Sequence, residues 1–266
     1  MVVTYRSNGE SKGIAIVREV SDTYADCSLQ YQQRESINIE FARVQHRAYI
    51  DALEELGLRV FVLPAEHGFP DACFVEDAAV LLDEIAVITW MGAKTRNGEQ
   101  EAVASCLSQW MELVYMEPPA QLEGGDVLKI GKLLFVAESS RTNRAGLEFL
   151  QAVAQPRGYR VIAVPVRKAL HLKTLVTAVG QSIVIAAPSI LAEVKEHMSN
   201  FTIIELTEEC AYAANVMSID GTVLVPRGYQ SVAAQIVSLG FTVKELEMSE
   251  FRKGEAGLTC LSIIID

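Results

Sequence analysis

The sequence lacks the features that mark several large classes of protein. It has no Lys/Arg-rich run and a net charge of -11, which argues against a polyphosphate partner such as DNA or RNA. No segment approaches the ~20 apolar residues needed to cross a bilayer, and residues 1–10 contain no apolar core of signal-peptide length. These absences predict a cytoplasmic protein that binds neither nucleic acid nor membrane.

Cysteine is also sparse. The five cysteines are scattered and odd in number, and no two of them form a C-x-x-C pair: Cys27, Cys73, Cys106, Cys210 and Cys260. This spacing argues against a disulfide framework and against a Cys-rich zinc site. We therefore expect free thiols in a reducing compartment.

What the chain does contain is a repeating order of secondary structure. Hydrophobic residues make up 50% of it, enough for a large core in one large domain or two small ones. Strand, strand, helix and strand recur at intervals of roughly 40–50 residues, about five times, which is typical of a radial or stacked repeat. Because no Pro/Gly/Ser linker interrupts the series, we predict a single α/β domain over residues 1–266.

Apolar periodicity and turn residues place the elements. The expected helices are 39–56, 99–113, 144–154, 190–198 and 229–239, and the expected strands are 13–18, 59–64, 73–82, 85–89, 126–130, 132–137, 159–165, 172–179, 182–186, 202–206, 216–219, 222–226 and 241–246. The polar stretch 21–36 is expected to be a mobile loop or lid. A last strand through Cys260 is expected to pair with N-terminal elements and complete the fifth unit.

Three separated residues could form a nucleophilic site. Cys260 lies between a Gly-containing turn and a β-branched run, His171 begins a strand after a chain reversal, and Glu123 precedes the Gly124–Gly125 pair. Taken singly, each has a structural alternative: a small buried thiol, a structural histidine and an acid beside a turn. A nucleophilic Cys, however, needs a lowered pKa or an adjacent base, and that base needs an orienting group. The three residues would fill these roles.

Acidic side chains surround the expected strand 73–82. Along a strand, Asp71 and Asp77 share one face by their even spacing, and Glu76 points the other way. The structural alternative is a solvated strand end with edge charges. The functional interpretation is a carboxylate pair for a guanidinium, whose planar fork of donors matches it.

Two arginines occupy comparable places in successive units. Arg96 and Arg141 each lie in a loop shortly before an expected helix, where a fixed guanidinium could hold a carboxylate. The Ser and Thr residues in 139–142 are more simply explained as N-caps of the helix that follows.

These stretches resemble the dimethylarginine dimethylaminohydrolases, which belong to the guanidine-modifying (pentein) superfamily with arginine deiminases and amidinotransferases. The likeness covers most of the chain and rests on five ordered motifs: Phe-Val-Glu-Asp (74–77), Leu-Glu-Gly-Gly-Asp-Val (122–127), Ser-Arg-Thr-Asn (140–143), Leu-His-Leu-Lys (170–173) and Leu-Thr-Cys-Leu-Ser (258–262). It implies a five-bladed α/β propeller with pseudo-fivefold symmetry, in agreement with the repeat count.

The resemblance also implies a role for each candidate residue. Cys260 would be the nucleophile, His171 the general acid/base and Glu123 the acid that orients it. The implied substrate-binding groups are Asp71 and Asp77 for the guanidinium with Glu76 in support, Arg96 and Arg141 for the α-carboxylate, and backbone groups near Leu29 and Gly254 for the α-amino group. Gly254 replaces a larger apolar residue usual in relatives. No metal or organic cofactor is required.

The implied reaction is hydrolysis of Nω-methylated arginine to citrulline and a methylamine through a covalent Cys thiouronium intermediate. The main alternative is an arginine deiminase or another guanidino-compound hydrolase, although arginine deiminases generally carry an added helical module that this chain lacks. A second alternative, a non-catalytic propeller that only binds, predicts loss of the Cys, His or acid, and all three are present. The sequence is compatible with a monomer or a homodimer.

Overall fold

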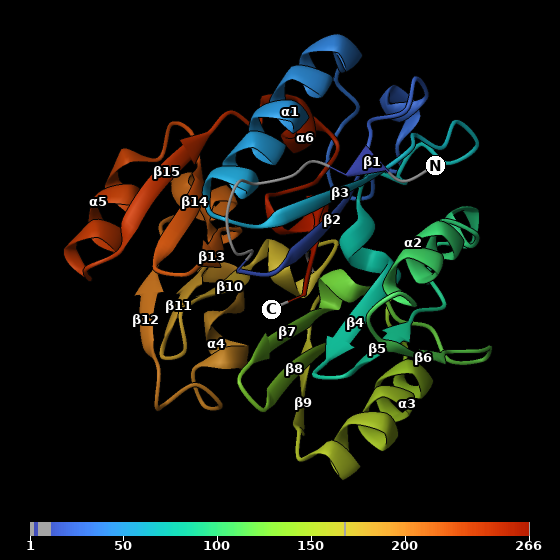
Figure 1. Cartoon of the computed structure of the whole chain (residues 1–266). Coiled ribbons are helices and arrows are strands. Elements are labelled where there is room, and N and C mark those ends of the chain that lie inside the picture. Colours follow the sequence, from blue (N-terminus) through green and yellow to red (C-terminus); the bar gives the residue numbers. More distant parts are fainter. Residues whose placement is uncertain (1–2, 5–11, 168, 266) are drawn as a thin grey trace.

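Five small sheets make up the mixed α/β fold of this computed structural model, which describes residues 3–4, 12–167 and 169–265 (Figure 1). In that part of the chain, four sheets have three strands and one has four. Each three-stranded sheet repeats one plan. A hairpin joins the first two strands, and a helix leads from the second strand to a third that runs parallel to it.

The last such sheet shows how the sequence produces this plan. β13 (Met217–Ile219) and β14 (Thr222–Pro226) pair antiparallel across Asp220–Gly221, whose left-handed φ values of 45° and 81° match the twist of a tight hairpin. α5 (Gln230–Ser238) then carries the chain back, so that β15 (Thr242–Leu246) pairs parallel with β14.

The other three-stranded sheets have the same pattern of antiparallel and parallel pairs. They are β4 (Ala79–Leu82), β5 (Ile85–Ile88) and β6 (Glu112–Tyr115) with α2 (Gln100–Leu107); β7 (Val127–Ile130), β8 (Leu133–Glu138) and β9 (Arg160–Pro165) with α3 (Arg144–Ala154); and β10 (Val176–Val179), β11 (Ile183–Ala186) and β12 (Thr202–Glu205) with α4 (Leu191–Val194).

Residues from both ends of the chain complete the fifth sheet. β2 (Ile14–Arg18) and β3 (Arg59–Leu63) are parallel and are joined by α1 (Ile39–Glu55). β16 (Ile263–Ile265) pairs antiparallel with β2 and supplies the strand that a hairpin supplies elsewhere, and β1 (Val3–Thr4) extends the far edge. The expected pairing of the last strand with N-terminal elements is confirmed. α6 (Ser249–Lys253), which the sequence did not suggest, packs against α1.

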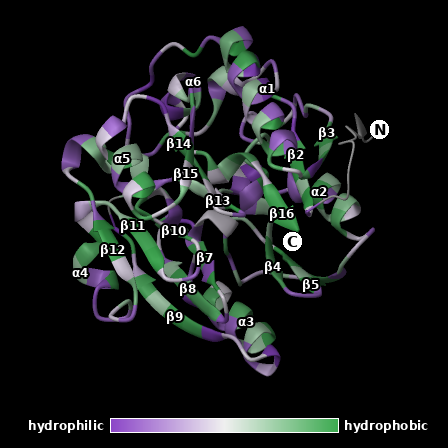
Figure 2. Cartoon of the chain, turned by 60° about the vertical axis from the view of Figure 1, so that its left-hand side comes forward, coloured by the Kyte–Doolittle hydropathy of each residue, from purple (hydrophilic) through white to green (hydrophobic). Residues whose placement is uncertain are grey.

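The strands consist mainly of hydrophobic residues, whereas the helices mix hydrophobic and hydrophilic ones (Figure 2). Leu147 and Leu150 of α3, for example, pack with Leu134 and Val136 of β8, and each such burial contributes about 1.5–3 kcal/mol. Among the described residues, no helix combines the length and apolar character that a bilayer crossing requires. Most of residues 1–10, in which the sequence shows no apolar core of signal-peptide length, lie outside the described residues.

Several expected boundaries are wrong. Val75–Ala78 and Leu172–Thr174 form 3-10 turns, so the strands β4 and β10 begin later than predicted. The helix expected at 99–113 ends at Leu107, because the chain must extend from Glu112 to pair with β5. The helix expected at 190–198 is regular only in α4, after the short turn Pro188–Ile190.

Candidate active site

Short 3-10 turns bring polar residues from distant parts of the chain to one place. Each turn closely precedes a strand at the same position in its unit, and neighbouring turns contact one another. Asp77 lies in the turn Val75–Ala78, Cys260 lies in Thr259–Leu261, and Glu123 and His171 directly precede Gly124–Asp126 and Leu172–Thr174. Equivalent turns in four units thus bring four different side chains, Asp77, Glu123, His171 and Cys260, to one site.

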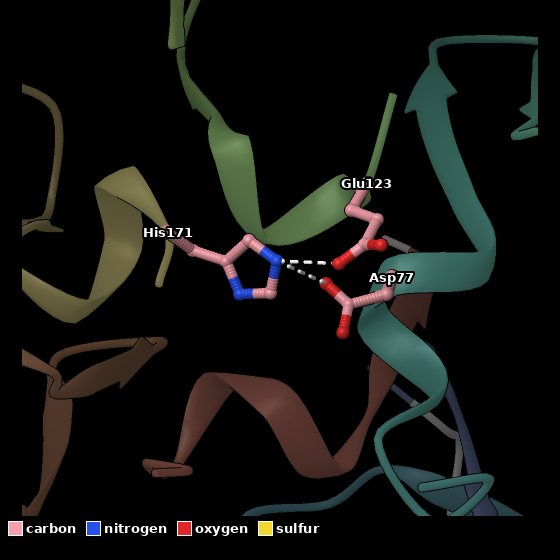
Figure 3. Close-up of side chains that lie close together, drawn as sticks. All are labelled: Asp77, Glu123 and His171. Carbon is pink, nitrogen blue, oxygen red and sulfur yellow. Dashed lines mark hydrogen bonds and ion pairs between the residues drawn. The ribbon is translucent and has the colours of Figure 1, made fainter. Parts of the chain in front are cut away.

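His171 points at two acids (Figure 3). Its Nε2 atom lies 2.7 Å from Glu123 Oε2 and 3.7 Å from Asp77 Oδ1. The His171 and Glu123 residues are 4% and 0% exposed. Burial lowers the pKa of His171, but the carboxylates of Asp77, Glu123 and Asp126 outweigh it and raise the pKa to about 9. His171 is therefore an imidazolium near neutral pH.

The Gly124–Gly125 pair allows this close arrangement. A Cβ on Gly125 would lie 2.7 Å from His171 Cγ and 2.8 Å from Asp77 Oδ1, and one on Gly124 would lie 2.0 Å from the Glu76 carbonyl oxygen. The Gly125 N–H also donates to Asp77 Oδ1 at 2.9 Å. The glycines are thus needed for close approach to other residues of the site.

Arg96 is buried among acids. Its Nη1 donates to Asp77 at 2.7 Å, and its Nε and Nη2 donate to the Glu99 carboxylate at 3.0 and 2.8 Å. Burial raises the pKa of Glu99 to about 7 although Arg96 opposes this. Nη1 is also 3.7 Å from Glu123. Arg96 therefore offsets the negative charge that surrounds His171.

Arg141 is held more loosely. Its Nη1 lies 3.3 Å from both Glu123 oxygens, and its Nε lies 3.4 Å from the side-chain oxygen of Gln30. The guanidinium lines the same cavity as Arg96 but has fewer short contacts. It is thus the more available of the two for an anionic ligand group.

The N-cap of α3 differs from the prediction. Asn143 caps the helix, because its Oδ1 accepts the Gly146 N–H at 2.8 Å. The Ser139 and Thr142 hydroxyls donate instead to Asp126 at 2.5 and 2.7 Å. They fix the acid beneath the His171 turn and do not cap the helix.

Cys260 lines a cavity of about 10 Å³ that brings most of the predicted residues together. Its other walls include Asp71, Asp77, Arg96, Arg141, His171 and Gly254. The Gly257 N–H donates to the Cys260 Sγ at 3.4 Å. Burial, followed by the Glu76 and Asp77 carboxylates, raises the pKa of Cys260 above that of an ordinary thiol. The sulfur is therefore protonated near neutral pH.

Asp71 and Glu76 lie on different sides of the Cys260 turn. The Asp71 carboxylate accepts the Ser28 N–H at 3.0 Å and the Ser28 hydroxyl at 3.1 Å, and it faces the small cavity. Glu76 instead contacts Thr259 Oγ1 at 2.9 Å and Lys173 Nζ at 2.6 Å, and it faces a separate cavity of about 800 Å³. As predicted, Glu76 points away from Asp71 and Asp77. The predicted cause, alternation along a strand, is wrong, because these residues precede the strand and Val75–Ala78 forms a 3-10 turn.

The loop over the cavity is tied down by Glu255. The Glu255 carboxylate accepts N–H groups from Gln30 at 2.9 Å, Tyr31 at 2.6 Å and Gln32. Leu29, directly before these residues, is half-buried and packs against apolar side chains. Ser28, in the stretch 21–36 that was expected to be a mobile loop or lid, lines the cavity; whether the stretch moves stays a prediction.

Gly254 also lines this cavity, and its surroundings explain the missing side chain. A Cβ there would lie 2.5 Å from the Tyr24 hydroxyl and 3.3 Å from Cys27 Sγ. Any larger residue at position 254 would therefore require Tyr24 to move.

Known proteins support the resemblance. A family model described as "N,N dimethylarginine dimethylhydrolase, eukaryotic" matches residues 17–234, more than half of the chain. A dimethylarginine dimethylaminohydrolase of Streptomyces coelicolor is 36% identical over 94% of this chain and 95% of its own length. The chain belongs to the dimethylarginine dimethylaminohydrolase family.

Other dimethylarginine dimethylaminohydrolases agree in sequence and in fold. The Pseudomonas aeruginosa protein is 34% identical over 82% of this chain and 86% of its own length. A solved structure of that organism's enzyme, a mutant complexed with citrulline, superposes with a TM-score of 0.91 over 96% of this chain and all of its own, at 31% identity.

One cluster in this dimethylarginine dimethylaminohydrolase family member has the composition of a metal site. Ligand atoms of Asp77, Glu123 and His171 lie within 4.8 Å of one another. Two guanidiniums already neutralise these acids, because Arg96 contacts Asp77 at 2.7 Å and Arg141 lies 3.3 Å from Glu123. A divalent cation would meet both positive charges at short range, so the group is better described as an ion-pair cluster.

Four residues of the site were not predicted from the sequence: Glu99, Lys173, Asn215 and Glu255. Lys173 belongs to a quoted motif, and its charge beside His171 was the available signal. Glu99, Asn215 and Glu255 lie outside the motifs; Glu99 is revealed by its local contact with Arg96, and the other two by contacts across the fold.

Proposed function

We propose that this chain hydrolyses Nω-methylated arginine, both asymmetric dimethylarginine and monomethylarginine, to citrulline and a methylamine. The observation that carries the proposal is one small cavity lined by a thiol, an imidazole and two carboxylates, from Cys260, His171, Asp71 and Asp77. Membership of the family supports it, as does the citrulline-bound structure of the Pseudomonas aeruginosa relative.

Substrate charge would start the reaction. Asp71 and Asp77 hold the guanidinium, and Glu76 supports them from behind the Cys260 turn. The cationic group offsets the carboxylates that raise the pKa of Cys260, so binding favours the thiolate, and the thiol proton is released to solvent because His171 is already protonated. The thiolate attacks the guanidinium carbon and forms a tetrahedral adduct.

His171 would then move protons at both stages. As an imidazolium it protonates the departing methylamine, and an S-alkylthiouronium group remains on Cys260. The neutral imidazole next takes a proton from water, which attacks the same carbon. Collapse of this second adduct releases citrulline and the sulfur. Glu123 orients the ring through its 2.7 Å contact with Nε2.

The remaining groups would position the amino acid part of the substrate. Arg96 and Arg141 bind the α-carboxylate, with Arg141 the freer of the two, and backbone groups near Leu29 and Gly254 bind the α-amino group. These assignments need no metal or organic cofactor. The Glu255 contacts hold the Leu29 loop against the site.

The same proposal covers the architecture. The five sheets are the blades of a five-bladed α/β propeller with pseudo-fivefold symmetry, within one catalytic domain over residues 1–266. The repeated order of antiparallel and parallel pairs supports this arrangement. We place the protein in the cytoplasm, as a monomer or homodimer whose ligand is a small guanidino compound.

The decisive assay compares substrates. Citrulline formation is measured side by side on asymmetric dimethylarginine, monomethylarginine and arginine. We expect both methylated compounds to be turned over, with kcat/KM for arginine lower by about tenfold or more, the scale on which a pocket discriminates small apolar groups. A preference for arginine would instead establish the alternative, an arginine deiminase.

Replacing Arg141 by methionine should separate substrate binding from chemistry. Methionine keeps an unbranched apolar chain and removes the charge, so we expect KM to rise roughly 10–100-fold, as for loss of a charge-assisted hydrogen bond. Arg144→Met is the matched control, because Arg144 is exposed and, within the described part of the chain, forms ion pairs with Glu138 and Glu148. Steady-state kinetics check both variants, and an unchanged KM in Arg141→Met contradicts the assignment.

A further inference from the structure

A buried asparagine joins the turn that carries the thiol to the turn that follows the imidazole. Asn215 is 3% exposed and ends the 3-10 segment Glu208–Ala214. Its Nδ2 donates to the Lys173 carbonyl at 2.9 Å and to Thr259 Oγ1 at 3.0 Å, and its Oδ1 accepts the Thr259 N–H at 3.0 Å. One amide thus bridges chain segments adjacent to His171 and Cys260.

The bridge closes into a ring of polar contacts. Thr259 Oγ1 donates to Glu76 at 2.9 Å, and Glu76 pairs with Lys173 Nζ at 2.6 Å. The backbone carbonyl of the same Lys173 accepts from Asn215, which closes the ring. Gly257 packs directly on the amide, since a Cβ on Gly257 would lie 2.4 Å from Asn215 Cγ. The Gly257 N–H is in turn the donor to Cys260 Sγ.

We propose that Asn215 is a positioning residue that sets the placement of Cys260 relative to His171. The inference rests on the proposed function and deepens it. The reaction needs the thiolate close to the guanidinium carbon and, at the same time, the imidazolium close to the leaving nitrogen on that carbon. Asn215 fixes the Thr259–Leu261 turn from below and holds Gly257 against the sulfur. It touches neither the proposed substrate nor the reacting atoms.

Two nearly isosteric substitutions test the bridge. Asn215→Asp keeps an oxygen for the Thr259 N–H and loses both donated bonds; Thr259→Val removes the shared hydroxyl. We expect either to lower kcat roughly 10–100-fold while KM changes by less than about threefold, because a small misplacement slows chemistry more than binding. Thr259→Ser should retain kcat. The double variant should lose no more than the worse single one, since both break one unit.

Stability is controlled separately. Asn38→Ala removes a helix cap at which Oδ1 accepts the Phe41 N–H at 3.0 Å, far from the proposed site. We expect Asn38→Ala to lower Tm by about 2–4 °C and to leave kcat unchanged. Asn215→Asp should lower Tm by a similar amount but should also lower kcat. Kinetics measured well below both Tm values then separate positioning from loss of folded protein.

A readout without substrate keeps this inference independent of the proposed function. Iodoacetamide alkylation of Cys260 is followed at pH 8 by peptide mass spectrometry, with half-buried Cys210 as internal reference. Asn215→Asp should slow Cys260 about fivefold, because Gly257 is no longer held as a donor to the thiolate, and should leave Cys210 unchanged. No turnover of any guanidino substrate by wild type would overturn only the proposed function. Asn215→Asp with both kcat and Cys260 alkylation within twofold of wild type would overturn the positioning role.

Discussion

Replacing Cys260 by serine is expected to lower citrulline formation by at least about 10³-fold and to leave the fold intact. A serine hydroxyl ionises far above neutral pH, so the cationic substrate cannot turn it into a nucleophile as it turns the thiol into one. The fold should survive because Sγ accepts only a long 3.4 Å bond from Gly257, which a hydroxyl oxygen can also accept. Binding of asymmetric dimethylarginine, measured by calorimetry, should persist, since Asp71 and Asp77 are unchanged.

Cys210→Ser is the matched control for this variant. Cys210 is half-buried in another unit and lies 3.7 Å from the Ser231 hydroxyl, away from the cavity. It should retain wild-type kcat. A Cys260→Ser protein with a near-normal rate would refute the nucleophile assignment. In the wild type, rapid acid quench followed by mass spectrometry should locate a substrate-derived adduct on the Cys260 peptide.

The positions of the site residues were predictable because each follows from a local pattern. Cys260 before a β-branched run and His171 after a reversal both occupy the entrance to a strand, and the repeat brings such entrances together. The Gly124–Gly125 pair predicted a turn, which is present as Gly124–Asp126. Five ordered motifs then selected one family, and the comparisons confirm that selection.

The turns themselves were not predictable from periodicity. Apolar spacing continues through Val75–Ala78 as it would in a strand, and the chain turns there because the Glu76 carbonyl lies against Gly124, far along the sequence. Glu99 and Asn215 were also not predictable, because neither belongs to one of the motifs. Glu99 acts through Arg96 in its own loop, and Asn215 acts through Thr259 in another unit. A single sequence does not show which residues will be in contact in the folded chain.

The electrostatics of the site explain how a protonated thiol and an imidazolium can serve one reaction. Burial and nearby acids raise the pKa of Cys260, whereas nearby acids alone raise the pKa of His171 to about 9 against the effect of burial, so both groups keep their protons near neutral pH. A bound guanidinium changes the balance at the sulfur, because its positive charge favours the thiolate, and His171 keeps the proton that the departing amine needs. The enzyme would then be reactive only when occupied, which limits unwanted chemistry at the sulfur.

Replacing Glu123 by glutamine should therefore shift the pH dependence as well as the rate. Burial would raise the pKa of Glu123, but His171 and the two arginines hold it low, so the acid is a carboxylate at working pH. Its loss removes one of the charges that raise the pKa of His171, and burial, which lowers that pKa, is then opposed only by Asp77 and Asp126 among the causes that act on the ring. We expect kcat to fall roughly 10²–10³-fold, within the range for impaired general acid catalysis.

The direction of the pH shift follows from the role of the proton. Amine departure needs protonated His171, and that form persists only below its pKa. The basic limb of the kcat profile should thus move to lower pH in Glu123→Gln by one unit or more, and lowering the pH should recover part of the lost rate. Glu138→Gln, an exposed acid that pairs with Arg144, should leave the profile in place. A Glu123→Gln profile with an unmoved basic limb would show that Glu123 does not control the charge of His171, and the orienting role would then have to rest on geometry alone.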